Sequence, residues 1–179
     1  MTFSEAPPVD IRCLFPSKLT VPGEIFGCKV QKWSLHLDIA PTPSNATTTF
    51  KLTQRDLYNA AYKRAMNDEV KEAAGSAIPE VVLYNENGLI TEGSFTSLYF
   101  VRDGYWVTPR VTELSRDRDE QEWRGGQRGT TRRWALENEI CVEGDVTVDS
   151  IKDGERVWVS NGVRGFGYGE IRRTLKSKK

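Results

Sequence analysis

The segment Asn87-Gly-Leu-Ile-Thr-Glu-Gly-Ser-Phe-Thr-Ser97 combines a short apolar run, a carboxylate and a tight glycine turn. Leu89 and Ile90 predict a strand, and Glu92 comes at its end, immediately before Gly and Ser. The apolar neighbours favour partial burial of Glu92. A buried carboxylate needs a partner, and a protonated ring nitrogen of a ligand can fill that role. An ordinary glutamate in a turn fits this stretch at least as well, so the choice between the two interpretations depends on other segments.

Patterns upstream of this segment predict short strands within residues 9–40 and one helix after them. Residues 31–40 alternate apolar and polar side chains, which is typical of a half-buried strand and places His36 on its solvated polar face. Residues 41–49 have the composition of a loop. Residues 54–74 repeat apolar side chains at spacings of three and four, so we expect an amphipathic helix that ends at Gly75.

Two hairpin signals surround the opening segment. A strand at 81–84 is followed by a turn at 85–88, after which the chain returns through Glu92. Strands at 97–101 and 105–108 flank a second turn signal, Arg102-Asp-Gly104. We expect these hairpins to form one antiparallel block.

The remaining residues extend an α+β pattern. The expected elements are a solvated loop at 110–128, a helix at 129–137, strands at 141–148 and 156–160, a glycine-rich stretch at 161–169 and a frayed basic tail at 172–179.

The amino-acid composition limits which partners and which kinds of catalytic site are expected. The 179 residues carry equal numbers of basic and acidic side chains, so no net charge favours nucleic acid or an anionic membrane. No apolar run approaches the ~20 residues of a membrane span. The three cysteines lack metal-site spacing and suggest reduced thiols in a cytoplasmic protein. His36 is the single histidine of the sequence, which makes a Ser-His-Asp triad or a histidine-rich metal site a poor candidate. Chemistry is therefore expected from lysine, carboxylates or a bound cofactor.

Two kinds of segment besides Glu92 could contribute. Lys51 lies between a Thr-rich loop and a helix, where partial burial lowers the pKa of an amine and makes it a nucleophile. Gly129-Thr130-Thr131 opens a helix, and Ser160-Asn161-Gly162 follows a strand; both can present backbone N–H groups to a phosphate. An exposed lysine, ordinary helix capping and a plain glycine turn are the alternatives.

Along the chain, Lys51 comes first, then Glu92, then the two possible phosphate sites. In this order the segments resemble the class IV family of pyridoxal phosphate (PLP) enzymes, which includes branched-chain and D-amino acid aminotransferases and 4-amino-4-deoxychorismate lyase. Besides the opening segment, the matching stretches are Phe50-Lys-Leu-Thr-Gln-Arg-Asp-Leu-Tyr58, Asp103-Gly-Tyr-Trp-Val-Thr-Pro109, Gly129-Thr-Thr-Arg-Arg133 and Val159-Ser-Asn-Gly-Val-Arg-Gly165.

The resemblance implies a role for each candidate residue. Lys51 matches the lysine that forms an aldimine with PLP, and Glu92 matches the carboxylate that pairs with the pyridine nitrogen. Gly129, Thr130 and Thr131 match the phosphate site at the start of a helix. Asn161 and Gly162 fall on a second phosphate-contacting turn. Arg55 gives the Lys-x-x-x-Arg spacing that is commoner in the lyase branch and is grouped with the cofactor-binding residues.

The resemblance also implies a fold, with two departures. We expect antiparallel strands in a pseudo-barrel with packed helices, and a homodimer. Ser97 stands where the family usually has Asn. Only 50 residues precede Lys51, so the N-terminal domain and its phosphate-binding arginine are expected to be largely missing. Residues 1–49 would be a remnant of that domain with an interdomain strand and loop, residues 50–171 the PLP-binding domain, and residues 172–179 the tail.

Three functions are compatible with these residues. The first is a lyase of the folate branch that converts 4-amino-4-deoxychorismate to p-aminobenzoate and pyruvate. The second is an aminotransferase for a branched-chain or D-amino acid. The third is a truncated relative without activity.

Overall fold

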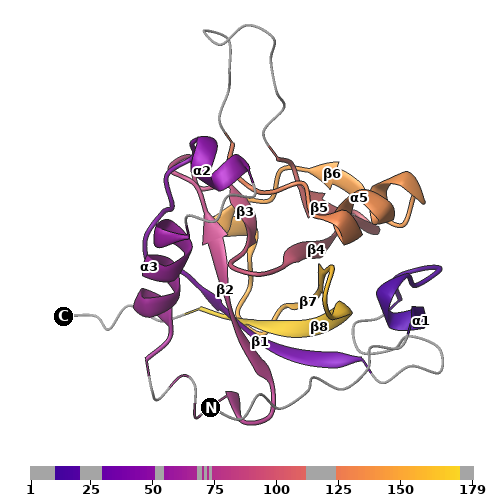
Figure 1. The fold of residues 1–179 in the computed structure, drawn as a ribbon, viewed down its shortest axis with the longest axis horizontal. Coiled ribbons are helices and arrows are strands. Elements are labelled where there is room, and N and C mark those ends of the chain that lie inside the picture. The colour runs from indigo at the N-terminus through magenta and orange to yellow at the C-terminus, as the bar shows by residue number, and fades with distance from the viewer. Residues whose placement is uncertain are drawn as a thin grey trace, which may run out of the picture.

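A computed structural model describes residues 11–20, 30–50, 55–67, 70, 72, 74–111 and 124–173 (Figure 1). The named elements in chain order are α1 (Ile11–Leu14), β1 (Gln31–Leu37), α2 (Ala46–Thr49), α3 (Asp56–Ala65), β2 (Ile78–Tyr84), β3 (Ile90–Gly93), β4 (Ser97–Arg102), β5 (Tyr105–Pro109), α5 (Thr130–Glu137), β6 (Val142–Gly144), a 3₁₀ turn (Val148–Ser150), β7 (Arg156–Asn161) and β8 (Gly165–Arg172).

The strands form one mixed sheet in the order β3-β2-β1-β8-β7-β4-β5-β6. The sheet curls until its two ends meet, because Ile90 N–H donates to Val146 O at 2.7 Å and Val148 N–H donates to Gly88 O at 2.9 Å. This closure confirms the predicted α+β fold and its barrel-like sheet.

The two predicted hairpins exist, but they do not form one antiparallel block. β2 pairs with β3 and β4 pairs with β5, both antiparallel, and β1, β8 and β7 separate the two hairpins in the sheet order. β1 lies between them and runs parallel to both β2 and β8. The prediction was wrong because local turn signals identify hairpins without fixing their order in a sheet. The domain boundary after residue 49 remains a prediction.

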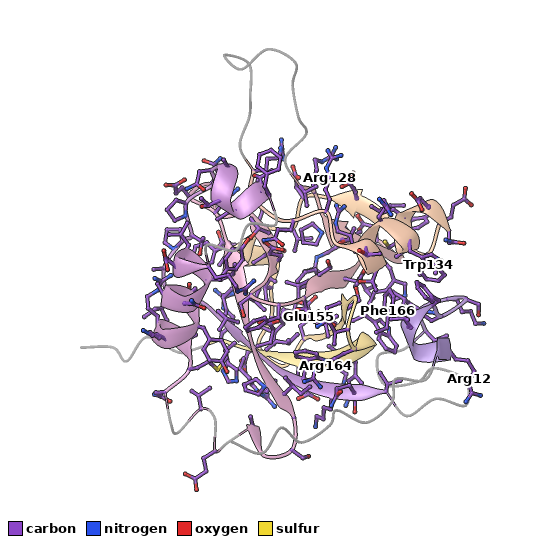
Figure 2. The ribbon with its side chains drawn as sticks, viewed as in Figure 1. Arg12, Arg128, Trp134, Glu155, Arg164 and Phe166 are labelled. Atoms are coloured by element: carbon purple, nitrogen blue, oxygen red, sulfur yellow. The ribbon has the colours of Figure 1, made fainter. Side chains whose placement is uncertain are left out.

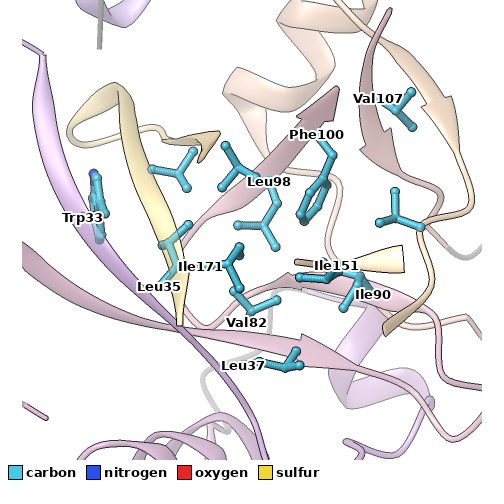
Figure 3. Packing of buried hydrophobic residues seen from close by; sticks show 13 residues of the cluster. Trp33, Leu35, Leu37, Val82, Ile90, Leu98, Phe100, Val107, Ile151 and Ile171 are labelled. Carbon is cyan, nitrogen blue, oxygen red and sulfur yellow. The ribbon is translucent and has the colours of Figure 1, made fainter. Parts of the chain in front are cut away.

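Apolar residues on the inner faces of the strands fill the curled sheet (Figure 3). This core includes Trp33, Leu35, Val82, Leu98 and Phe100. Their alternation along β1, β2 and β4 follows from the two-residue period of a strand.

His36 is buried, with 8% of its surface exposed, which corrects the prediction of a solvated histidine. β1 is an inner strand, and His36 lies opposite Val81, which packs beneath α3. Burial and the nearby charge of Arg172 lower the pKa of His36. Alternation along one strand cannot reveal that its second face is also covered.

The helix expected at 54–74 is interrupted. α3 ends at Ala65, and residues 66–67 are not helical. The Asn67 side chain accepts a 2.8 Å bond from Val70 N–H, as a helix-capping side chain does. α3 itself packs Tyr58, Ala61 and Ala65 on the outer face of β2. Among the described helices, none has the length and apolar character to cross a membrane.

The glycine-rich stretch that follows β7 contains strand β8. A Cβ at Gly167 would lie 2.5 Å from Trp33 Nε1, and one at Gly169 would lie 2.7 Å from Leu35 Cγ. Glycine is therefore needed where β8 packs against side chains of β1.

Candidate active site

Glu92 lies in β3 and is 9% exposed. Tyr58 Oη donates a 2.6 Å hydrogen bond to Glu92 Oε1, and the backbone N–H of Gln127 donates a 3.2 Å bond to Oε2. Both partners are neutral, so among the residues that the structure describes no cation donates a hydrogen bond to this buried carboxylate. Such a group favours a cationic ligand.

Burial raises the pKa of Glu92 to about 7, and the negative charge of Glu80 adds to the increase. The hydrogen bonds from Tyr58 and Gln127 and the positive charge of Arg55 act in the opposite direction. Glu92 can therefore exchange a proton near neutral pH.

Gln127 connects Glu92 to the start of α5. Its side-chain Nε2 donates a 3.1 Å bond to Tyr58 Oη, and its carbonyl accepts a 2.9 Å bond from Gly129 N–H. Gly129 is the N-cap residue of α5. The carboxylate and the beginning of the helix are thus held by one short segment.

α5 is fixed on the outer face of the sheet by an aromatic contact and an ion pair. Trp134 meets the edge of Phe166 in β8, with ring centroids 6.4 Å apart (Figure 2). The buried Arg132 pairs with Glu143 and donates a 2.9 Å bond to Pro109 O. These contacts determine where the N-terminus of the helix points.

Three buried hydroxyls meet at this N-terminus. Thr131 Oγ1 lies 2.8 Å from Ser160 Oγ, which lies 2.7 Å from Tyr99 Oη. Two hydrogen bonds use two of the three hydroxyl protons, so one proton remains for a ligand. The two segments predicted to contact a phosphate, one at the start of α5 and one at the end of β7, are therefore adjacent.

The first turn of α5 has no side-chain cap. Its N–H groups and the positive end of the helix dipole suit an anion. Ser97, the residue that departs from the family pattern, lies opposite Ser160 in the β4–β7 pair. A Cβ at Gly129 would lie 3.1 Å from Ser97 Oγ, so glycine allows the backbone to approach this serine.

Other predicted residues lie at the margin of this arrangement. Thr130 is exposed, unlike Thr131. The Asn161 side chain accepts bonds from Val163 N–H and Arg164 N–H and so shapes its own turn. No atom lies within 4 Å of a Cβ built on Gly162.

Lys51 falls outside the described residues, so its predicted role remains a prediction. Arg55 donates a 2.6 Å bond to Ser94 O, just beyond Glu92, and its guanidinium stacks on the rings of Tyr58 and Phe95.

Sequence reasoning assigned no role to Tyr58, Gln127 or Tyr99. Tyr58 ends the stretch Phe50–Tyr58 that matches the family pattern, but nothing in that stretch indicates that its hydroxyl reaches Glu92. Gln127 lies in a polar stretch without a pattern. Tyr99 is in a strand where any large side chain would satisfy the core.

Known proteins share this chain's sequence pattern. The family model for amino-transferase class IV matches residues 29–167. A provisionally named aminodeoxychorismate lyase of Schizosaccharomyces pombe is 31% identical over 137 residues, which cover 74% of this chain and 52% of that protein. The aminodeoxychorismate lyase of Saccharomyces cerevisiae is 30% identical over 156 residues, which cover 82% of this chain and 38% of that protein. The chain thus spans about half or less of the length of these relatives.

A solved structure has a similar fold. A provisionally named amino-acid aminotransferase of Mesorhizobium loti superposes with a TM-score of 0.60 at 26% identity, covering 79% of this chain and 60% of that one.

Proposed function

The chain belongs to the class IV aminotransferase family, and we propose that it acts as a PLP-dependent lyase that converts 4-amino-4-deoxychorismate to p-aminobenzoate and pyruvate. The observation that carries this proposal is the buried carboxylate of Glu92, whose hydrogen-bond donors among the described residues are neutral, joined through Gln127 to the uncapped start of α5.

The described residues fit PLP at two of the three points that the cofactor needs. Glu92 supplies a carboxylate for the ring nitrogen. The first turn of α5 and the hydroxyls of Thr131 and Ser160 supply donors for a phosphate. Lys51, the third point, is proposed from the sequence alone.

PLP supplies an electron sink for bonds broken at the carbon next to the substrate's amino nitrogen. The Glu92 carboxylate would hold the proton of the ring nitrogen, because an ionised carboxylate in a buried site stabilises an adjacent cation. Tyr58 and Gln127 favour the ionised form of Glu92 by donating to both oxygens. An ionised Glu92 would thereby favour the protonated, electron-poor form of the ring.

The phosphate would be held by neutral donors. The hydroxyl chain of Thr131, Ser160 and Tyr99 would offer its one remaining proton, and the first turn of α5 would offer backbone N–H groups. The amine of Lys51 would carry the cofactor, accept a proton from the substrate carbon and return a proton as enolpyruvate departs.

Two observations favour a lyase over an aminotransferase. The two curated relatives that are at least 30% identical bear the name aminodeoxychorismate lyase. Arg55 has the Lys-x-x-x-Arg spacing, and it contacts the turn that follows Glu92.

Borohydride reduction of the purified protein with PLP tests the cofactor site. We expect a stable adduct that peptide mass mapping places on Lys51. Lys51→Ala should abolish it, whereas Lys63→Ala, which changes an exposed lysine of α3, should retain it. An adduct that persists in Lys51→Ala would contradict the assignment.

The reaction is tested by supplying 4-amino-4-deoxychorismate and measuring pyruvate, in parallel with amino transfer from branched-chain and D-amino acids to 2-oxoglutarate. Release of pyruvate supports the lyase. Transfer alone would indicate the aminotransferase, and neither activity together with no adduct would indicate an inactive relative. Light scattering of the same samples tests the proposed homodimer.

A further inference from the structure

Glu80 is a second buried carboxylate, located in β2 with 0% of its surface exposed. It accepts four hydrogen bonds: from Ser94 Oγ at 2.6 Å, Val81 N–H at 2.8 Å, Phe95 N–H at 3.0 Å and Thr96 Oγ1 at 3.0 Å. None of these donors is charged. A carboxylate is costly to bury, so a full set of donors without a cation indicates a specific structural task.

Three of the four donors lie in residues 94–96, the turn that immediately follows Glu92. The same turn is closed by Gly93 N–H, which donates to Thr96 O at 2.7 Å, and is tied to β2 by Ser94 N–H, which donates to Val81 O at 2.9 Å. The turn therefore wraps around the Glu80 carboxylate.

Gly93 shows how closely this turn is packed. A Cβ at Gly93 would contact Thr96 Oγ1 and would lie 3.0 Å from Glu80 Oε2. The space that a side chain would occupy at this residue is already filled by the atoms that organise the turn. This packing also constrains the backbone of Glu92, the preceding residue.

Arg55 holds the turn from its other side. Its guanidinium donates to Ser94 O at 2.6 Å and lies 4.7 Å from the centre of the Phe95 ring. Ser94 is thus bound through its side chain by Glu80 and through its carbonyl by Arg55.

We propose that Glu80 is a positioning residue whose carboxylate templates the Ser94–Thr96 turn and thereby fixes the orientation of Glu92. The importance of that orientation for a ring nitrogen rests on the proposed function. The structural relationship between Glu80, the turn and Glu92 does not depend on it.

Electrostatics couple the two carboxylates as well. Burial raises the pKa of Glu80, while its four hydrogen bonds lower it and favour the ionised form. An ionised Glu80 in turn raises the pKa of Glu92. Replacing Glu80 therefore changes both the geometry and the titration of Glu92.

The test compares Glu80→Gln with wild type in the absence of ligand. Glutamine is similar in shape, but its NH₂ group faces two donors that need an acceptor. We expect the amide protons of Gly93 and Phe95 to exchange about tenfold faster. Carbon-13 NMR of labelled glutamate, with Glu92→Gln to assign the signal, should show a lower Glu92 midpoint, because the negative charge of Glu80 is removed.

Glu86→Gln is the matched control, because Glu86 is exposed in the turn of the same β2–β3 hairpin. It should leave both the exchange rates and the Glu92 midpoint unchanged. A folded Glu80→Gln protein with wild-type exchange and a wild-type Glu92 midpoint would overturn the proposal.

Thr96→Val provides a second measurement should Glu80→Gln not fold. It removes one donor to Glu80 while retaining the carboxylate and the branched shape of the side chain. We expect about threefold faster exchange at Phe95, and unchanged exchange would also overturn the proposal. Failure of wild type to form a PLP adduct would remove the proposed function without altering these ligand-free results.

Discussion

Tyr58 Oη donates a 2.6 Å hydrogen bond to Oε1 of Glu92 and joins α3 to the carboxylate proposed to face the cofactor ring. The bond connects a helix that begins shortly after Lys51 with the strand that carries Glu92. The bond therefore links the segment that follows Lys51 to Glu92, although these two candidate residues lie far apart in the sequence. Because it lowers the pKa of Glu92, the direction in which its removal changes that pKa can be predicted.

Tyr58→Phe should raise the pKa of Glu92 above about 7, because the Tyr58 hydrogen bond lowers it in the wild type. A hydrogen bond to an ionised group contributes about 1.5–3 kcal/mol, so the midpoint should rise by about one to two pH units. Carbon-13 NMR of the Glu92 carboxyl measures this change. Tyr62→Phe, on the same helix, is the control and should leave the midpoint in place.

The elevated pKa of Glu92 should make stability depend on pH. The folded carboxyl titrates at about 7, compared with 4.5 for an ordinary glutamate, so the folded state binds more protons between these values. The contribution of Glu92 is fully present below about pH 4.5 and is lost as pH rises through about 7.

Urea unfolding of wild type and Glu92→Gln at pH 5 and pH 8 checks this. Wild type should lose about 3 kcal/mol more than the variant over that interval. Equal pH dependence in the two proteins would show that Glu92 titrates normally.

Thr131→Val should weaken PLP binding about tenfold, because it removes a hydroxyl from the Thr131–Ser160–Tyr99 chain. Thr130→Val should have a smaller effect, since Thr130 is exposed and its backbone N–H remains. Fluorescence titration with PLP compares the two variants. A larger effect at Thr130 would place the phosphate away from Ser160.

Gly93→Ala should destabilise the fold by about 1–3 kcal/mol, because its Cβ would be forced against Thr96 and Glu80. Gly162→Ala is the control, since a Cβ there meets no atom within 4 Å. It should change the free energy of unfolding by less than about 0.5 kcal/mol. Similar effects of the two substitutions, measured by urea unfolding, would contradict this account of the turn.

Glu92 and Thr131 were predicted as site residues because each belongs to a short motif that resembles the class IV family. The sequence did not predict Glu80, which looks like one polar residue in an apolar strand until residues 94–96 fold around it. Likewise, nothing near Tyr99 in the sequence indicates that its hydroxyl reaches Ser160.

The fold shows the same contrast between features with local sequence signals and features that depend on distant contacts. Turn residues such as Gly88 and Gly104, both with positive φ, marked the hairpins correctly. The parallel placement of β1 between β2 and β8 depends on contacts between distant segments. The burial of His36 was missed for that reason, because its surroundings come from other parts of the chain.

The central position of β1 also bears on how the protein acquires its structure. Residues 31–36 pair with residues 167–172, so one edge of an inner strand has no partner until β8 has been synthesised. Pairing across such a separation is slow, and an open apolar edge is prone to pair with other chains. While residues 38–166 are being synthesised, this edge of β1 should therefore be exposed to aggregation, and protection should depend on prompt docking of β8.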